Sequence, residues 1–229
     1  YKRQLQHHPI AAIQATRVPF RESAGAPMHR PMAPVHLTFE TLSGPALQPL
    51  LPVLSELRIA VFREWPYLYE GAATSEQDYL GAYASAPGSA IVICRDGDRV
   101  VGAATCGPMT EGQADVRATF QAAGLDPARL CYFGESVLLP AYRGQGAGLR
   151  FFAEREAHAR RLGLPEATFC GVIRDDADLR RPADYVELDG FWTRRGYVRR
   201  PELVVRFRWK IFGEAAESDH DLMFWTRRL

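Results

Sequence analysis

The order of apolar and polar positions divides the chain into short apolar or alternating runs and longer segments with helical periodicity. The short runs predict strands over residues 35–42, 89–94, 99–106, 131–139, 167–173, 203–211 and 222–229. Helical periodicity covers residues 47–64, 75–86, 110–123, 149–162 and 188–195. Asp96-Gly97 between the second and third runs predicts a hairpin. The order of these elements predicts an α/β (mixed α+β) fold around one central sheet.

The stretch over residues 131–162 combines a strand, a turn, a glycine-rich loop and a long helix. The strand ends at Pro140, and the loop reads Arg143-Gly144-Gln145-Gly146-Ala147-Gly148. The apolar stripe expected on the helix consists of Leu149, Phe152, Ala153 and Ala157. The first N–H groups of a helix have no internal partner and lie at its positive end, and glycines let a diphosphate approach them closely. The stretch therefore predicts an anion site rather than a plain connection.

Two common phosphate-binding motifs do not match this loop. A Rossmann fingerprint requires G-x-G-x-x-G, and Leu149 stands where its third glycine would follow Gly144 and Gly146. A P-loop requires Gly-Lys-Ser/Thr, which does not occur in the sequence. A nucleotide-binding oxidoreductase is therefore disfavoured.

The loop resembles the acyl-CoA signature of the GCN5-related N-acetyltransferases (GNAT superfamily). That signature is a strand ending near a proline, followed by Gln/Arg-x-x-Gly-x-Gly/Ala at a helix start, and here Leu138-Leu139-Pro140 leads into Arg143 to Gly148. A second match is Phe191-Trp192-Thr193-Arg194-Arg195-Gly196-Tyr197, which is similar to the family's Leu/Phe-Tyr-x-x-x-Gly-Phe ending. The resemblance covers the chain from about residue 35 to its C-terminus.

The resemblance implies a central twisted mixed β-sheet flanked by helices, with the glycine-rich loop between the fourth strand and the third main helix. It also implies acetyl-CoA as co-substrate, without a metal. The loop residues would hold its pyrophosphate: Arg143, Gly144, Gln145, Gly146, Ala147 and Gly148. The strand backbone near Val137 and Leu138 would pair with the pantetheine arm.

Glu135 is the residue we expect to act as the catalytic base, because family members place a glutamate on this strand and apolar neighbours surround it. The alternative is a structural carboxylate paired with an arginine from the loop or a neighbouring strand. The family's usual acid is a tyrosine, but this chain has Trp192 there, and an indole N–H cannot supply a proton to a thiolate. Tyr185 is the expected catalytic substitute, and Cys170 is expected to be a core residue.

Substrate-side residues are expected between the first two helices, where the segment over residues 62–71 carries four aromatic side chains, a proline and a glycine. By resemblance this segment shapes the acceptor site, so Tyr67, Tyr69 and Glu70 are candidates, with packing as the alternative role. Asp175, Asp176 and Asp178 would attract a cationic amine or belong to a solvated mixed-charge loop with the arginines that follow.

The amino-acid composition is that of an ordinary globular protein and adds little to the functional assignment. Hydrophobic residues make up 47% and charged residues 24%, and the net charge of +1 gives no argument for a nucleic acid or membrane partner. The four cysteines lack metal spacing, which favours free thiols and a reducing cytoplasm. Residues 1–34 differ in composition and are interpreted as a cloning-derived or flexible extension, and residues 35–229 as a single acetyltransferase-like domain. A homodimer through the long aromatic strand is one option.

The sequence thus predicts an N-acetyltransferase that moves an acetyl group from acetyl-CoA to a small-molecule or peptide amine by direct attack on the thioester. The alternative is a non-catalytic acyl-CoA-binding or sensing domain, which the tryptophan at position 192 motivates.

Overall fold

The computed structural model describes residues 36–229. The predicted N-terminal extension lies outside the described residues, as does the first residue of the predicted strand over residues 35–42. Within the described part of the chain, we find no helix with the length and apolar character needed to span a lipid bilayer.

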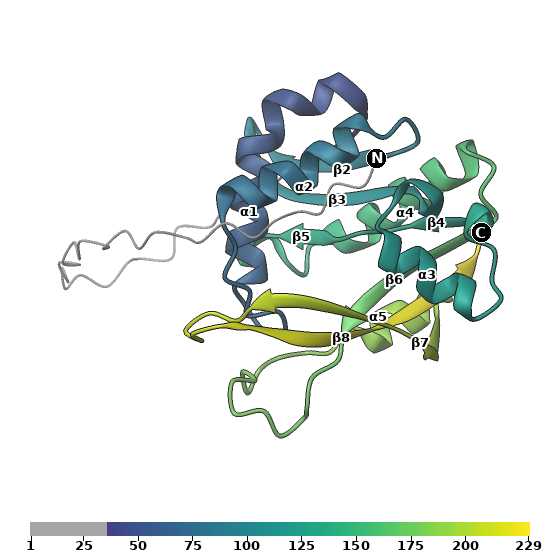
Figure 1. The fold of residues 1–229 in the computed structure, drawn as a ribbon. Helices are drawn as coiled ribbons and strands as arrows, with labels where there is room; N and C mark the ends of the chain where they lie inside the picture. Colours follow the sequence, from purple (N-terminus) through teal and green to yellow (C-terminus); the bar gives the residue numbers. More distant parts are fainter. Residues whose placement is uncertain (1–35) are drawn as a thin grey trace. The chain divides into compact units, whose positions relative to one another are not determined.

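The described chain folds around one eight-stranded mixed sheet with the strand order β1-β2-β3-β4-β6-β8-β7, and β5 pairs with β3 off this path (Figure 1). The strands are β1 (Leu37–Leu42), β2 (Ala90–Asp96), β3 (Arg99–Pro108), β4 (Leu130–Tyr132), β5 (Ser136–Leu138), β6 (Glu166–Val172), β7 (Val198–Lys210) and β8 (Glu217–Arg228). Among the strand pairs of residues 36–229, only β4–β6 is parallel, and the predicted β2–β3 hairpin is present. The predicted mixed α/β fold is confirmed.

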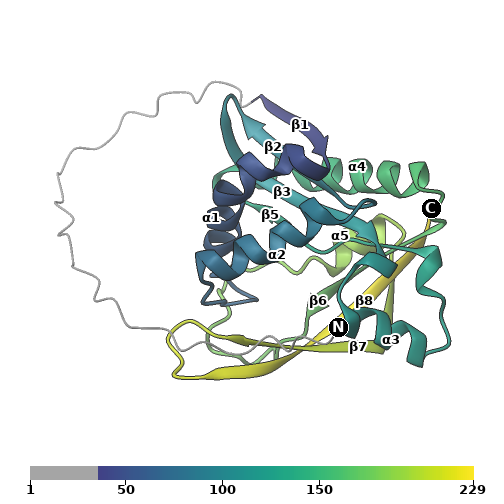
Figure 2. The same ribbon diagram turned by 45° about the horizontal axis from the view of Figure 1, so that its top comes forward.

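Helices cover both faces of the sheet (Figures 1 and 2). They are α1 (Leu51–Phe62), α2 (Ala73–Ser85), α3 (Ala114–Ala122), α4 (Ala147–Arg161) and α5 (Asp189–Arg194), with short 3-10 turns η1 (Gly44–Leu50), η2 (Met109–Glu111), η3 (Pro127–Arg129) and η4 (Pro140–Tyr142). One face carries α1, α2 and α3, and the other carries α4 and α5. The glycine-rich loop lies between β5 and α4.

Proline chemistry explains where the first helical region changes geometry. The pattern predicts one helix over residues 47–64, whereas the structure has the 3-10 turn η1 followed by α1 from Leu51. Pro49 lies inside η1 and Pro52 occupies the first turn of α1, where a missing N–H costs no internal hydrogen bond. The regular α-helix is therefore confined to the later part of the range that the pattern predicts.

The predicted apolar stripe of α4 is correct at Phe152, which is buried, but wrong at Leu149 and Ala153. Leu149 is half exposed and Ala153 is exposed, whereas the side of the helix that packs on the sheet includes Phe151, Arg155 and Ala159. An apolar pattern identifies only apolar core positions, and α4 also buries Arg155. A charged residue occupies a core position of this helix, and tertiary packing overrides the simple pattern.

Candidate functional site

A bulge in the strand next to β3 opens the sheet. Between the pairs Gly107–Tyr132 and Ala104–Ser136, β3 has two intervening residues and the opposite strand has three, Phe133 to Glu135. This extra residue divides the predicted strand over residues 131–139 into β4 and β5. β4 pairs with β6, but β5 pairs only with β3, so a gap opens between β5 and the later half of β6.

The β5 backbone presents polar groups to this gap. The Leu139 N–H donates to Val101 O of β3 at 3.0 Å. Along an antiparallel strand, the backbone N–H and C=O groups of successive residues point alternately toward one neighbouring strand and toward the opposite side. Val137 therefore pairs with Ala103, while the N–H and C=O groups of Ser136 and Leu138 point toward the gap. Of the two residues expected at the pantetheine arm, Leu138 turns its backbone to the gap, and Val137 is fully buried against β3.

The glycine-rich loop ends as an open helix N-terminus. Gly146 is the N-cap of α4 with φ 83°, and its carbonyl accepts from Arg150 N–H at 3.2 Å. Gly144 has φ 76°, and a Cβ atom added at either glycine would meet no atom within 4 Å. No side chain among the described residues caps α4, so its first N–H groups remain available for an anion.

The other loop residues have distinct surroundings. Arg143 donates from Nε to Leu138 O at 3.3 Å and pairs through Nη2 with Glu64 at 2.8 Å. Gln145 donates to a backbone carbonyl of η4, while Ala147 is buried at the start of α4. Gln145 and Ala147, but not Arg143, also line a second, open cavity of about 680 Å³ beside β1.

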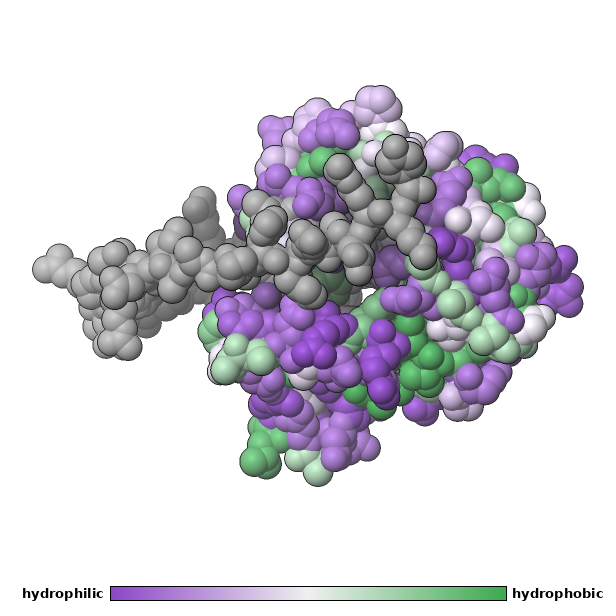
Figure 3. Space-filling view, in the orientation of Figure 1, coloured by the Kyte–Doolittle hydropathy of each residue, from purple (hydrophilic) through white to green (hydrophobic). Residues whose placement is uncertain are grey.

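The sheet gap belongs to a cavity of about 1340 Å³ that joins the loop to the opposite face of the sheet. Its wall includes Gly144, Gly146 and Gly148 at one end and Leu138 and Glu135 in the middle. Aromatic residues of α1, α4, α5, β6 and β8 complete it. A volume above the usual range for small-ligand pockets accommodates a long, extended ligand. Figure 3 shows mainly polar residues on the outer surface of the β7–β8 hairpin, in contrast to this aromatic interior.

Glu135 reaches the α1–α2 face from the bulge, and its side chain is only 6% exposed. Its Oε1 pairs with Arg58 Nη1, and its Oε2 accepts from the Tyr79 hydroxyl at 2.8 Å. Arg58 Nε also bonds Glu76, whose other oxygen accepts from Tyr69 at 2.8 Å. Burial opposes the charge on Arg58, but Glu135, Tyr79 and Glu76 outweigh it and raise its pKa. The pairing partner comes from α1 rather than from the loop or a neighbouring strand.

Trp192 and Tyr185 both line the cavity. The Trp192 ring packs edge-on against Phe169 with centroids 5.0 Å apart, and a Cβ at Gly171 would lie 3.1 Å from it. Glycine at position 171 thus makes room for the indole. Tyr185 lies in the segment before α5 with its ring 6.2 Å from Trp65, and burial raises the pKa of its phenol.

The residues expected on the substrate side separate into two groups. Tyr67 lines the cavity. The Tyr69 hydroxyl turns to the buried Glu76, and the Glu70 carboxylate pairs with Lys210 at 3.2 Å, so neither side chain belongs to the cavity wall. The structure therefore brings Glu135, Tyr185 and Tyr67 to one cavity with the glycine loop, but not Tyr69 and Glu70.

The sequence model of the acetyltransferase (GNAT) family matches residues 56–181, which is more than half of the chain. The chain belongs to the GNAT acetyltransferase family. No curated protein matches its sequence.

Solved GNAT structures share the fold at low sequence identity. The acetyltransferase yncA from Salmonella typhimurium, solved with its cofactor acetyl-CoA, has 14% identity and a TM-score of 0.53 over 84% of this chain and 94% of that one. A ribosomal-protein-alanine N-acetyltransferase from Brucella melitensis has 14% identity and a TM-score of 0.54, covering 84% and 99%. A GCN5-related N-acetyltransferase from Kribbella flavida has 19% identity and a TM-score of 0.51, covering 86% and 100%.

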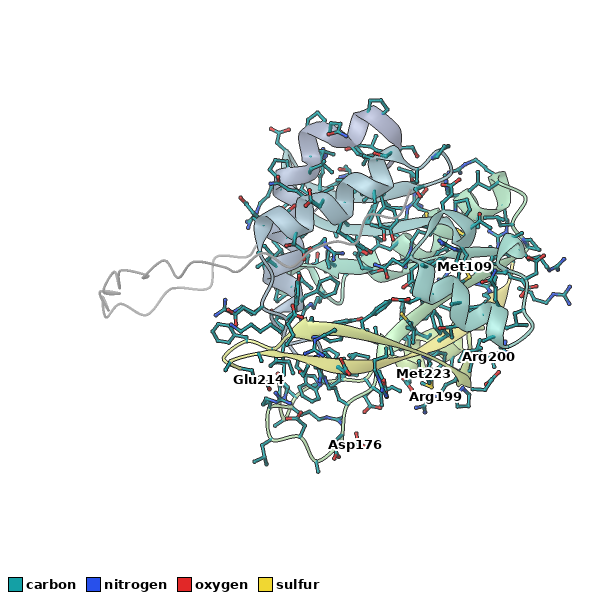
Figure 4. The ribbon with its side chains drawn as sticks, viewed as in Figure 1. Met109, Asp176, Arg199, Arg200, Glu214 and Met223 are labelled. Carbon is teal, nitrogen blue, oxygen red and sulfur yellow. The ribbon has the colours of Figure 1, made fainter. Side chains whose placement is uncertain are left out.

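In this GNAT chain, a mixed-charge segment between β6 and α5 contributes to one end of the cavity wall. Arg180 pairs with Asp178 at 2.7 Å and with Glu214 of the β7–β8 turn at 3.1 Å, and Arg181 pairs with Asp176 at 2.7 Å. Hydrogen bonds from Arg180 hold the pKa of Asp178 at about 2. Figure 4 shows Asp176 on this segment and Glu214 in the turn. Because Asp176 and Asp178 have arginine partners, the mixed-charge alternative describes this loop.

Arg174 and Trp209 hold the segment after α1 against the β7–β8 hairpin. Arg174 donates to Pro66 O at 2.7 Å and to Tyr67 O at 3.0 Å, and the Trp209 N–H also donates to Tyr67 O. Arg174 Nη1 lies 3.2 Å from His220 Nδ1, and His220 Nε2 lies 3.3 Å from Trp209 O. A guanidinium only donates and a carbonyl only accepts, so His220 must be neutral with its proton on Nε2.

This arrangement predicts that stability falls in acid. Burial and then Arg174 lower the pKa of His220, so the unfolded chain binds more protons than the folded chain below the ordinary histidine pKa of about 6.5. The stabilising contribution is present above that value and is lost as the pH falls below it. We expect the thermal unfolding midpoint to drop between about pH 7 and about pH 5, with a smaller drop in His220→Gln. His36→Gln, at an exposed position, is the matched control. Identical curves for wild type and His220→Gln would contradict the neutral assignment.

Sequence reasoning missed two arginines of this GNAT site. Arg58 lies on α1 beneath Glu135, and Arg155 lies on the sheet-facing side of α4. A charged residue in phase with Phe151, Phe152 and Ala159 was the available signal for the second. For Arg58 the sequence carried no comparable signal, because only the packing of α1 on the bulge brings it to a residue 77 positions later.

Proposed function

We propose that this GNAT chain is an N-acetyltransferase that moves the acetyl group of acetyl-CoA to an amine by direct attack of the amine nitrogen on the thioester. The observation that carries the proposal is that one cavity is lined both by the open N-terminus of α4 and by Glu135 at the bulge. A phosphate-binding helix end and a buried carboxylate in one continuous cavity suit a long donor and a proton acceptor for the nucleophile.

The donor side is supported by the fit of the loop and the gap to acetyl-CoA. The N–H groups of Gly146, Ala147 and Gly148 suit the pyrophosphate, and Arg143 at the cavity edge adds positive charge. Ser136 and Leu138 offer backbone donors and acceptors to the amides of the pantetheine arm, in the way that a missing strand would. Val137 contributes by fixing β5 on β3.

The acceptor side is supported by charge. The buried group of Arg58, Glu76 and Glu135 carries one excess negative charge, which favours the approach of an ammonium ion. Glu135 would then accept a proton from the amine, directly or through one water molecule. Loss of that proton leaves a neutral nitrogen that can attack the thioester. As the N–C bond forms and the C–S bond breaks, the nitrogen releases its second proton to water, CoA leaves as a thiolate, and the first proton passes from Glu135 to solvent. Tyr67 and Tyr185 line the acceptor end and would position the amine.

The second candidate is a non-catalytic acyl-CoA-binding domain. It is favoured by one specific contact: Arg58 pairs directly with Glu135, so this carboxylate already has a structural partner. The indole of Trp192 in place of a hydroxyl adds to this alternative.

One pair of measurements separates the two candidates. Calorimetric titration of the full chain with acetyl-CoA measures binding, and a free-thiol assay over a panel of small-molecule and peptide amines measures transfer. Binding with amine-dependent thiol release supports the enzyme. Binding without release from any amine supports the sensor, and a lack of acetyl-CoA binding overturns both.

A further inference from the structure

Arg155 is a buried cation without a carboxylate partner among the described residues. It lies on the sheet-facing side of α4 and is 2% exposed. Its Nε donates to Phe151 O at 3.2 Å, and its Nη1 donates to the bulge carbonyl of Glu135 at 3.3 Å. Within residues 36–229, no acidic side chain lies within 4.0 Å of its guanidinium. The other buried arginine of the site, Arg58, has two carboxylates.

Aromatic rings replace the missing counter-ion only in part. The Arg155 guanidinium carbon lies 4.4 Å from the Phe133 ring centroid and 4.9 Å from that of Phe152. Such contacts stabilise a cation only modestly, whereas burying an unpaired charge in an apolar interior costs considerably more free energy. Burial accordingly lowers the pKa of Arg155. A permanent charge kept in this environment requires an explanation beyond packing.

The position of Arg155 in the cavity wall suggests a function for this unpaired charge. It lines the same cavity as Trp192, and the two are linked through a chain of rings, with Phe152 and Phe169 centroids 5.5 Å apart and Phe169 packed on Trp192. Nε and Nη1 have backbone acceptors, but no described residue accepts from Nη2. The guanidinium therefore has donor capacity left at the cavity floor, next to the bulge.

Transfer from a thioester creates negative charge that must be accommodated at this floor. The C–S bond breaks with its electron pair on sulfur, so the leaving group is a thiolate. Phenols are weak acids for this purpose here, because burial raises the pKa of Tyr67, Tyr132 and Tyr185 above the ordinary value. Trp192 offers only a neutral N–H. In a low-dielectric, aromatic site, a fixed cation is the most effective remaining means to stabilise that charge.

We propose that Arg155 stabilises the CoA thiolate as it leaves, remaining protonated throughout, so that thiolate rather than thiol is the first product in the cavity. This inference rests on the proposed function and adds a group to it. In the balanced step, the amine nitrogen bonds the acetyl carbon, its proton goes to Glu135 or water, and the sulfur departs as an anion paired with Arg155. Protonation of the sulfur follows after release into solvent.

The direct test titrates the thiol of CoA bound to the full-length wild-type protein, using the ultraviolet absorbance of the thiolate and desulfo-CoA as the blank. We expect the bound thiol to ionise about tenfold more readily than the thiol of free CoA, a shift of one pKa unit or more. In Arg155→Met that shift disappears and kcat falls by about 100-fold, the size typical of removing one preorganised electrostatic group. Arg155→Lys keeps the charge and retains part of the shift.

The outcomes are separable. If CoA bound to the wild type ionises like free CoA, the inference is wrong, whatever happens to any variant. If Arg155→Met folds, binds CoA and shows the wild-type ionisation, Arg155 acts only in packing and the inference is equally overturned. If neither CoA nor acetyl-CoA binds the wild type, the proposed function fails first, so the two failures are distinguishable.

Discussion

Glu135→Gln lowers kcat for amine acetylation by about 100-fold at neutral pH while the affinity for acetyl-CoA stays near that of the wild type. Gln keeps the shape of the side chain and an acceptor for the Tyr79 hydroxyl, and Arg58 retains Glu76 as its partner. What is lost is the proton acceptor at the cavity. Steady-state kinetics together with calorimetric titration of acetyl-CoA measure the two effects separately.

Glu76→Gln is the matched control for this variant. Glu76 bonds the same arginine and is equally buried, but it is not part of the cavity wall. Both substitutions remove one negative charge from the same cluster, so a purely structural role for Glu135 predicts similar losses in the two variants. A base role predicts a large loss only in Glu135→Gln, with partial recovery at high pH, where the amine is already deprotonated. Equal activity of Glu135→Gln and wild type would exclude the base assignment.

Gly146→Asp weakens acetyl-CoA binding by at least about tenfold, because two unit charges about 4 Å apart repel by about 4 kcal/mol near a protein surface. The aspartate would stand at the N-cap of α4 and would satisfy the N–H groups that we assign to the pyrophosphate. Gly146→Asn separates charge from bulk, since it offers a similar shape without the charge. Calorimetric titration with acetyl-CoA measures both.

The same helix provides a matched control at its other end. Gly163 follows α4 with φ 72°, and a Cβ there would meet no atom within 4 Å, as at Gly146. A non-glycine residue in this conformation costs about 1–2 kcal/mol at either position. Gly163→Asp should have the lower unfolding midpoint of the two, because its carboxylate lies at the negative end of α4 whereas the aspartate at position 146 lies at the positive end. Only Gly146→Asp should lose acetyl-CoA. Normal binding by Gly146→Asp would show that the pyrophosphate does not lie on this loop.

The relation between sequence and site differs from one residue to the next. The glycine loop was predictable because its function depends on local backbone geometry: positive φ values and a helix start are properties of consecutive residues. The helix that follows was predicted in place, and Phe152 was placed correctly on its buried side. The rest of that side was not identified, since Arg155 and Glu156 occupy core positions that an apolar pattern cannot show. Tyr69 and Glu70 were close in sequence to Tyr67, yet their side chains turn to Glu76 and Lys210.

By itself, the sequence of this protein determined the order of strands and helices, the hairpin, the position of the anion-binding loop and the family resemblance, because each depends on periodicity or on neighbouring residues. Only the tertiary structure decided that the strand before the loop splits at Phe133 to Glu135, and that one cavity joins the loop to the opposite face. It also decided that Arg58 meets the side chain of Glu135 while Arg155 meets its backbone. These contacts join residues on α1, the bulge and α4. Their charges interact strongly because they are buried, and they become buried only when helices cover both faces of the sheet.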